Sequence, residues 1–484
     1  MTRAARPPAP ERRHGEHDAS RFTDSLLADE GAVVSVDDFR RQFAAYGREA
    51  KARVERIPFA RLQDWAFSED TGNLEHRSGR FFTVEGLRVR PEAEPEATWT
   101  QPIINQPEIG ILGILAKEFD GVLHFLMQAK MEPGNANGFQ LSPTVQATYS
   151  NYTRVHRGSP VKYLDAFLEP RKGRVLVDVL QSEHGAWFWC KRNRNIIVET
   201  TEDVPLHEGF FWLTLGQLQR LLALDNVLNM DSRTVLSCAP VTLTDRVDRP
   251  PAGGDPFRAA LLRSLDPEAG TPLLAAEFLS WFVERKARTR VTRQRVALDD
   301  VDGWHRSQQV IDHTDGGHFG VIAVEVSGGN REVGGWTQPL FAPVGQGTVA
   351  FVVKSFGGVA HILVHARMEG GLLDVVELAP TVQEIPGDRL SARGQRNPFL
   401  GYVRDAGPER IHYEALLSEE GGRFHHAVSR YLVVDGDDLP AEVPDDYQWV
   451  TLGRLVGLLR HSHYLNVQAR TLVACLHGLW SRAR

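Results

Sequence analysis

The string Trp99-Thr100-Gln101-Pro102 recurs as Trp336-Thr337-Gln338-Pro339, 237 residues further along the chain. At the same offset, Pro143-Thr144-Val145-Gln146 meets Pro380-Thr381-Val382-Gln383. Matches of this kind, repeated at one fixed spacing, are the signature of an internal duplication. The sequence therefore predicts two copies of one domain.

The matches extend outward over most of the chain. Trp212, Thr214 and Leu215 return as Trp449, Thr451 and Leu452. The Pro- and Gly-rich stretch between the copies has the composition of a linker. We therefore predict a disordered tail over residues 1–20, a first repeat over 21–245, a linker over 246–256 and a second repeat over 257–484.

The composition excludes several classes of protein. The formal net charge is −7, which argues against a nucleic-acid-binding protein that relies on bulk positive charge. No apolar run is long enough for a membrane span, and residues 1–20 lack the apolar core of a secretory signal. The three cysteines form neither a disulfide framework nor a zinc motif, so we expect a cytoplasmic protein.

Each copy predicts an α+β fold. Helical stretches are expected over residues 36–54 and 274–289, followed by strands over 80–89, 109–117, 122–131, 175–180 and 195–199. Closing helices are expected over 215–224 and 452–459, with Thr214 and Thr451 as N-caps. Strands bracketed by helices without βαβ alternation indicate α+β domains.

The strand over 122–132 has two different faces. Alternation places its apolar side chains on one side, whereas His124, Gln128, Lys130 and Glu132 share the other. The second copy keeps His361, Arg367 and Glu369 at the matching positions. Such a polar face is either solvated or lines a site, and its presence in both copies leaves the two interpretations balanced.

Two basic, amide-rich clusters lie near aromatic residues of the first copy. One runs from Ser150 to Gly158, and the other is Lys191-Arg192-Asn193-Arg194-Asn195 after Trp187. Guanidinium groups bind phosphate oxygens and aromatic faces accept a pyrimidine, so the clusters favour a nucleoside-diphosphate site over a merely solvated surface. Of the second cluster only Arg430 clearly survives in the second repeat. That repeat is either a degenerate or differently tuned pocket, or it contributes to a shared one.

Several longer strings resemble those of the NDP-hexose 2,3-dehydratases. They include WTQPIINQPEIGILG, AKMEPGN, LSPTVQATYSNYTRVH, QSEHGAWF and KRNRN, together with their second-copy equivalents. The resemblance covers residues 21 to 480 and implies tandem Nudix-like domains, a homodimer and a dTDP-4-keto-6-deoxyglucose substrate. The Nudix box of metal-dependent pyrophosphatases is absent, so we expect neither a metal nor any other cofactor.

The chemistry of that substrate suggests roles for the candidate residues. The C4 ketone acidifies the C3 proton, which a base removes before the C2 hydroxyl leaves with help from an acid. The product is an unstable 3,4-diketo-2,6-dideoxy sugar, for which a downstream 3-ketoreductase is the expected partner. The candidate catalytic residues are Glu132, Glu183, Lys130, His124 and Tyr152. The candidate substrate-binding residues are Trp99, Gln101, Gln128, Thr144, Gln146, Asn151, Arg154, Trp187, Lys191, Arg192, Asn193, Arg194 and Asn195. A pocket of the second repeat would contain His361, Arg367, Glu369, Gln383, Glu419 and Arg430.

Two alternatives come from other classes. A non-catalytic nucleotide-sugar-binding or scaffold protein would bind the ligand without turnover. A divergent Nudix hydrolase would release thymidine monophosphate in a magnesium-dependent reaction.

Overall fold

The computed structural model describes residues 12–31, 33–49, 52–148, 160–169, 173–243, 255–267, 269, 275–328, 335–386 and 397–481. Three candidate residues, Asn151, Tyr152 and Arg154, lie outside the described residues, as does residue range 246–254 of the predicted linker. Within the described part of the chain, no helix is both long and apolar enough to span a membrane.

Each repeat is built on one seven-stranded mixed sheet, here called its core sheet. The first core sheet contains β10 (Arg174–Ser182), β12 (Arg192–Glu199), β6 (Gly110–Phe119), β7 (Val122–Met131), β13 (Phe210–Leu213), β8 (Phe139–Pro143) and β9 (Val145–Ala147). The second contains β21 (Val376–Pro380), β20 (Val359–Met368), β19 (Gly347–Phe356), β24 (Val428–Asp435), β23 (Ile411–Ser418), β22 (Val382–Glu384) and β25 (Tyr447–Thr451). β12 runs parallel to β6 and β24 runs parallel to β19, whereas the neighbouring strands are antiparallel.

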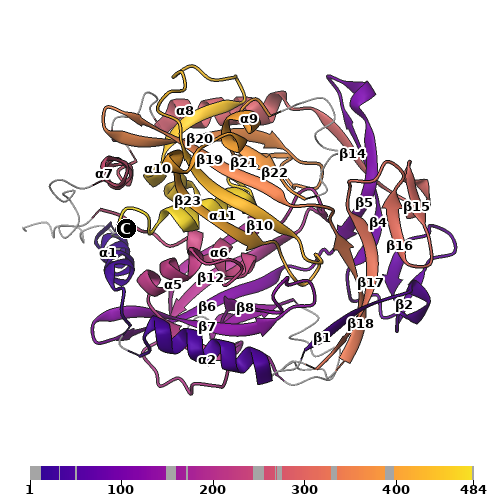
Figure 1. Cartoon of the computed structure of the whole chain (residues 1–484), viewed down its shortest axis with the longest axis horizontal. Coiled ribbons are helices and arrows are strands. Elements are labelled where there is room, and N and C mark those ends of the chain that lie inside the picture. The colour runs from indigo at the N-terminus through magenta and orange to yellow at the C-terminus, as the bar shows by residue number, and fades with distance from the viewer. Residues whose placement is uncertain are drawn as a thin grey trace, which may run out of the picture.

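Two smaller outer sheets lie beside the core sheets, on the right of Figure 1. One contains β1 (Arg53–Ile57), β17 (Gly320–Ser327), β16 (Val310–His313), β15 (Trp304–Arg306) and β18 (Gly335–Ala342). The other contains β11 (Phe188–Trp189), β5 (Trp99–Asn105), β4 (Thr83–Pro91), β3 (Leu74–His76), β2 (Trp65–Phe67) and β14 (Val291–Val296).

The outer sheets exchange strands between the repeats. β1 of the first repeat pairs antiparallel with β17 of the second, and β14 of the second repeat pairs antiparallel with β4 of the first. Each repeat therefore supplies the edge strand of the other repeat's outer sheet. The two repeats are therefore interlocked by shared sheets and are not separate domains joined only by a linker.

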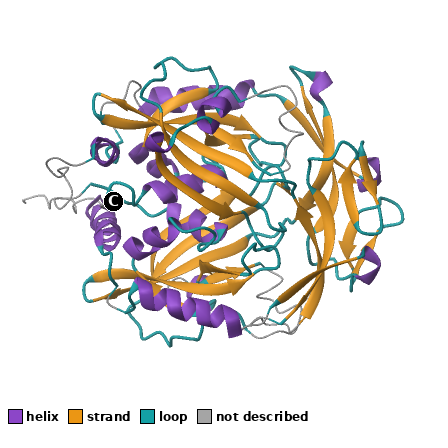
Figure 2. Cartoon of the chain, in the orientation of Figure 1, coloured by secondary structure: helices purple, strands orange, loops and turns teal. Residues whose placement is uncertain are grey.

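Helices cover the core sheets and fill the space between them (Figure 2). They are α1 (Arg12–Leu27), α2 (Val36–Glu49), α4 (Asp165–Leu168), α5 (Leu215–Leu222), α6 (Met230–Ser237), α7 (Pro256–Arg263), α8 (Ala275–Arg288), α9 (Leu400–Arg404), α10 (Leu452–Leu458) and α11 (Val467–Leu476). Four 3₁₀ turns are also described: η1 (Phe59–Arg61), η2 (Pro95–Ala97), η4 (Leu298–Asp300) and η5 (Pro408–Arg410). The N-cap predicted at Thr214 is confirmed and forms a capping box, because its hydroxyl accepts from the Gln217 N–H and the Gln217 side chain accepts from the Thr214 N–H. Thr451 also occupies the N-cap position of α10, but its hydroxyl makes no cap hydrogen bond and donates instead to the Pro267 carbonyl over 3.2 Å.

α6 and α11 join the two repeats through reciprocal contacts. The buried Arg233 of α6 donates to the Ser418 carbonyl, and the buried Arg470 of α11 donates to the Ser182 carbonyl. Arg470 Nε also lies 2.6 Å from the hydroxyl oxygen of Thr234 in the facing helix. Each arginine thus binds a backbone carbonyl of the other repeat at the end of a core strand.

The predicted α+β fold is confirmed, with two differences near the N-terminus. Residues 12–20, predicted to be disordered, belong to α1. Ala19, Phe22 and Leu26 recur at helical spacing and are each at most 5 % exposed, so one face of this polar segment packs into the core. The predicted helix over 36–54 ends at Glu49, since residues from Arg53 onward form the exchanged strand β1.

Candidate active site

A pocket of about 320 Å³ lies at the open end of the first core sheet, where both outer sheets and a loop of the second repeat meet. The first repeat supplies Lys130, Glu132 and Gln146 from the β7–β9 region. The second repeat supplies Trp336 of β18 and the pair Glu420 and Arg423. The pocket is therefore shared between the repeats.

Three carboxyl groups meet at one end of the pocket. Single oxygens of Glu132, Asp231 and Glu420 lie within 4.8 Å of one another. The Gln146 amide donates to Glu132 over 2.7 Å, and the Asn229 amide holds Gln146 over 3.2 Å. Burial and the neighbouring carboxylates raise the pKa of Asp231 well above its ordinary value. Burial, reinforced by the facing Glu132, raises the pKa of Glu420 to about 7. Both shifts favour the protonated form of Asp231 and Glu420.

Three cations face the same space. Lys130 Nζ lies 3.2 Å from the Gln146 carbonyl oxygen, and the buried Lys191 donates to the Glu108 carbonyl. Burial lowers the pKa of Lys191 to about 8, although Glu183 opposes this shift. The Arg423 guanidinium lies over the Phe82 ring, 4.3 Å from its centroid, with one nitrogen 3.4 Å from Gln106 Oε1. This local positive charge exists in a chain that is acidic overall.

Glu183 forms a second buried acid beside the cluster. Its Oε1 accepts from the Asn193 amide over 2.7 Å, and the side chain is almost completely buried. Burial raises its pKa, while Arg470, His184 and Lys191 oppose the shift.

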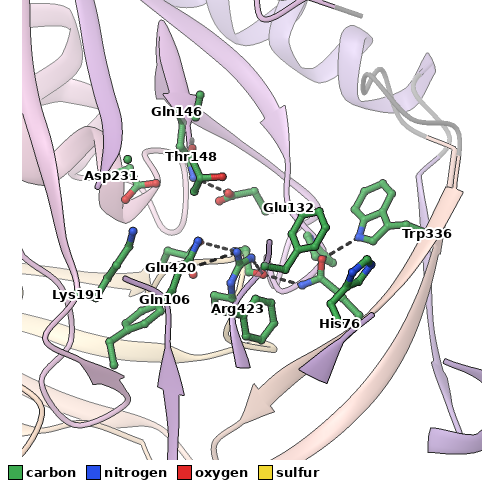
Figure 3. A pocket seen from close by; sticks show the side chains of 18 of the residues that line it. His76, Gln106, Glu132, Gln146, Thr148, Lys191, Asp231, Trp336, Glu420 and Arg423 are labelled. Atoms are coloured by element: carbon green, nitrogen blue, oxygen red, sulfur yellow. Dashed lines mark hydrogen bonds between the residues drawn. The ribbon is translucent and has the colours of Figure 1, made fainter. Parts of the chain in front are cut away.

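The other end of the pocket is aromatic. Trp65, His76, Phe81 and Phe82 come from the first repeat, and Trp336 comes from the second. Figure 3 shows His76 and Trp336 at the opposite side of the view from Asp231 and Lys191, with Arg423 between them. The pocket therefore has an aromatic end, a central guanidinium and an acidic end.

Glu420 and Arg423 reach the first repeat because the loop between β23 and β24 crosses over to it. Gly134 lies against this loop: its N–H donates to the Gly421 carbonyl over 2.7 Å, and its carbonyl accepts from the His426 N–H over 2.8 Å. A Cβ at Gly134 would overlap the carbonyl oxygen of Phe424, so only glycine permits the approach. The loop between β10 and β12 makes the same contacts with Gly371 of the second repeat.

The equivalent region of the second repeat is filled by side chains of both repeats. His184, carried over from the first repeat, lies 3.0 Å from Glu419 Oε2 and 2.8 Å from the Gln468 amide nitrogen. Glu369 accepts from Gln383 over 2.6 Å. The fully buried Trp187 aligns with Arg423 of the first pocket, and Ala427 aligns with Lys191. The second region thus has an imidazole, an amide, an indole and a methyl group where the first has Glu420, Asp231, Arg423 and Lys191.

Some of the predicted site residues line the pocket, and others do not. The residues brought together there are Lys130, Glu132, Gln146, Glu183, Lys191 and Asn193. The described residues predicted for the first site but found outside the pocket lining are Trp99, Gln101, His124, Gln128, Thr144, Trp187, Arg192, Arg194 and Asn195.

Several of these outlying residues have structural roles instead. The Arg194 guanidinium forms a two-point ion pair with Asp178 across β10 and β12, and Arg430 pairs with Glu414 in the equivalent place. His124 is fully buried, with Nδ1 2.9 Å from the Val122 carbonyl oxygen, and His361 repeats this contact with Val359. The predicted contacts of Arg194 with a diphosphate and of His124 with a ketone are therefore corrected.

Three further predicted residues stabilise the fold. Thr144 bridges β7 and β6 by donating to the Leu126 carbonyl and accepting from the Leu115 N–H. Trp99 donates to Gln101 Oε1, and Gln101 donates to the Ala186 carbonyl, which fastens the crossing loop. Among the predicted second-repeat residues, Arg367 Nε lies 3.3 Å from Glu369, which also accepts from Gln383, so these three form an internal network.

Asp231, Glu420 and Arg423 line the pocket but were not predicted from the sequence. Each stands at a position where the two copies differ inside an otherwise matching string: Asp231 aligns with Gln468, Glu420 with His184, and Arg423 with Trp187. Differences of this kind between duplicated strings were the available signal. The crossing of the loop was not visible in the sequence.

A second group of potential metal ligands, His313, Asp315 and His318, lies in the outer sheet. The Asp315 N–H donates to His313 Nδ1 over 3.1 Å, just as the Ser78 N–H donates to His76 Nδ1 over 3.2 Å in the other copy. His313 and His76 thus use Nδ1 to cap the same turn in the two copies.

Comparison with known proteins agrees with the duplicated architecture. The family model for NDP-hexose 2,3-dehydratase matches twice, over residues 36–239 and 275–476. A dTDP-4-dehydro-6-deoxy-alpha-D-glucopyranose 2,3-dehydratase of Saccharopolyspora spinosa is 51 % identical over 472 residues, covering 97 % of each chain. Enzymes of the same name from Amycolatopsis orientalis and Streptomyces violaceoruber are each 49 % identical, covering 97 % and 92 % of this chain and 96 % and 98 % of their own. The chain therefore belongs to the NDP-hexose 2,3-dehydratase family, a family of hydro-lyases.

Proposed function

We propose that the pocket shared between the repeats removes water across C2 and C3 of dTDP-4-dehydro-6-deoxy-glucose. The observation that carries this proposal is the order of groups along the pocket. An aromatic end suits thymine, Arg423 in the middle suits the diphosphate, and the acidic end beside two lysines suits a keto sugar.

The acidic end contains the groups that the reaction needs. Glu132 is positioned by the Gln146 amide and takes the C3 proton, which the C4 ketone has acidified. Lys130 and Lys191 supply the positive charge that stabilises the enolate oxygen. The C2 hydroxyl then leaves, and the resulting enol relaxes to the 3,4-diketone. The electrons stay within the sugar, so no redox cofactor is required.

We assign turnover to the first repeat's pocket alone. The matching carboxyl in the second repeat, Glu369, is held by Gln383, Arg367 and Asn466, and Trp187 occupies the position that corresponds to Arg423. The second repeat's carboxyl group therefore has no cation equivalent to Lys191, which aligns with Ala427, and none equivalent to Arg423.

The test is to incubate the protein with the 4-keto sugar nucleotide and follow thymidine diphosphate released as the diketone decomposes. With a 3-ketoreductase added, a stable 2-deoxy product should accumulate instead. Glu132→Gln should lose at least about 100-fold in turnover number, whereas its matched control Glu369→Gln should stay within about twofold of the wild type. Binding without turnover, or magnesium-dependent release of thymidine monophosphate, would contradict the proposal.

The instability of the product supports a reductase partner acting directly downstream. Further parts of the proposal are the homodimer and the Nudix-like fold implied by the family resemblance. The cytoplasmic location expected from the cysteine content is another part of it. Light scattering of the purified protein at micromolar concentration tests the dimer, for which twice the chain mass of 54.1 kDa is expected.

A further inference from the structure

We propose that Glu420, supplied by the second repeat's crossing loop, is the catalytic acid that protonates the departing C2 hydroxyl in the first repeat's pocket. This inference rests on the proposed function and adds to it the residue that completes the elimination. The site then needs both repeats, because the first supplies the base, Glu132, and the second supplies the acid, Glu420.

The Glu420 carboxyl is held at one oxygen and open at the other. Oε1 accepts from the Gly422 N–H over 3.0 Å, which fixes the group in the loop. Oε2 is buried and has no hydrogen-bond partner among the described residues. The groups facing this carboxyl are Glu132, Asp231, Glu183 and Arg423. Burial, together with the negative charges of Glu132 and Glu183, raises its pKa to about 7, although Arg423 opposes this shift. A carboxyl that keeps its proton near neutral pH can donate it.

The stereochemistry of the substrate requires an acid in this place. In a sugar of D-gluco configuration, the C3 hydrogen and the C2 hydroxyl lie on the same face of the ring. A base and an acid that serve these adjacent carbons must therefore approach from one side and lie within a few ångströms of each other. Glu132 and Glu420 satisfy this condition, since their nearest carboxylate oxygens are within 4.8 Å.

The protons balance over a complete cycle. Glu132 takes the C3 proton, and the electron pair of that bond moves to the C4 oxygen to form the enolate. The pair returns as the C2–C3 double bond forms, the C2–O bond breaks, and the proton of Glu420 leaves with the hydroxyl as water. The 3-enol then gives its hydroxyl proton to Glu420 while Glu132 returns its proton to C2. Both groups regain their starting states.

The matching position in the other repeat has lost this capacity. His184 crosses to the second repeat as Glu420 crosses to the first, but each ring nitrogen of His184 has a partner, Glu419 on one side and Gln468 on the other. Both loops therefore cross to the opposite repeat. Only the loop of the second repeat brings an acid with an unpartnered oxygen, Glu420, into the opposite pocket.

The experiment separates proton removal from departure of the hydroxyl. Wild type, Glu420→Gln and the matched control Glu414→Gln, which alters an exposed acid in the preceding strand β23, are incubated with substrate in deuterated buffer. Exchange at C3 is read by mass spectrometry of recovered substrate, and dehydration is read as thymidine diphosphate released. A second substrate carries fluorine in place of the C2 hydroxyl, because fluoride departs without needing a proton.

We expect Glu420→Gln to lose at least about 100-fold in dehydration while C3 exchange and fluoride release stay within about threefold of the wild type. Glu414→Gln should match the wild type in all three readings. Equal losses of exchange and dehydration, or a fluoride release that falls as far as water release, would overturn the assignment of Glu420. A wild-type protein that neither exchanges nor dehydrates would overturn the proposed function itself, and this inference with it.

Discussion

Replacing Glu420 with Gln should stabilise the protein, and only at higher pH. The folded protein raises the pKa of this carboxyl from an ordinary 4.5 to about 7. Between these values the folded state holds a proton that the unfolded state has released, so stability is fully present below pH 4.5 and falls as the pH rises toward 7. The difference corresponds to about 3 kcal/mol. Two like charges at 4.8 Å, the upper limit of the separation between the Glu132 and Glu420 oxygens, would repel each other by a similar amount, about 3 kcal/mol at an effective dielectric constant of about 20.

The assay is urea unfolding at pH 5 and pH 8. Glu420→Gln has no titration at this position, so its advantage in free energy of unfolding over the wild type should grow by about 2 to 3 kcal/mol between these pH values, because the unfolded carboxyl is already largely ionised at pH 5. Glu414→Gln is the control. Because Arg430 lowers the pKa of Glu414, that carboxyl is mostly ionised in both states over this range, and the difference from wild type should change by much less. An advantage of Glu420→Gln that is equal at pH 5 and pH 8 would refute the reasoning.

Three further predictions concern binding, the crossing loop and metal. Arg423→Gln should weaken binding of thymidine diphosphate at least about tenfold by calorimetry, whereas Arg194→Gln, which removes an ion pair with Asp178, should leave it unchanged; equal effects would contradict the site. Gly134→Ala should lower the free energy of unfolding by at least about 2 kcal/mol, because the added methyl group overlaps the crossing loop. The control is Gly457→Ala on an exposed face of α10, which should raise the free energy of unfolding by about 0.5–1 kcal/mol. Removing divalent ions with a chelator should leave turnover unchanged, since shared protons and nearby lysines compensate the carboxyl cluster; activity that disappears and returns with magnesium would show that the cluster binds metal.

The sequence predicted the features that depend on local pattern or on repetition. The strand over 122–131 has the predicted bounds, and its apolar face (Leu123, Phe125, Met127 and Ala129) lies in the core. The recurrence at an offset of 237 residues predicted the duplication. Both signals are written in short stretches of sequence.

The parts of the site that were missed depend on long-range geometry. Glu132 and Glu420 are neighbours only because one loop crosses from the second repeat to the first, and no local pattern encodes that crossing. The assignment of Arg194 to the diphosphate was wrong because it, too, depends on geometry that a local pattern does not encode. Lys191 and Arg194 lie three positions apart, yet Lys191 reaches the pocket while Arg194 pairs with Asp178 outside it.

The most direct test of the account is a crystal structure of the protein with dTDP-glucose. This ligand lacks the C4 ketone that acidifies the C3 proton, so it should bind without reacting. We predict the thymine between His76 and Trp336, the diphosphate at Arg423, and C2 and C3 of the sugar facing Glu420 and Glu132. A sugar bound beside Glu369 and Glu419 of the second repeat, with the first pocket empty, would contradict the account.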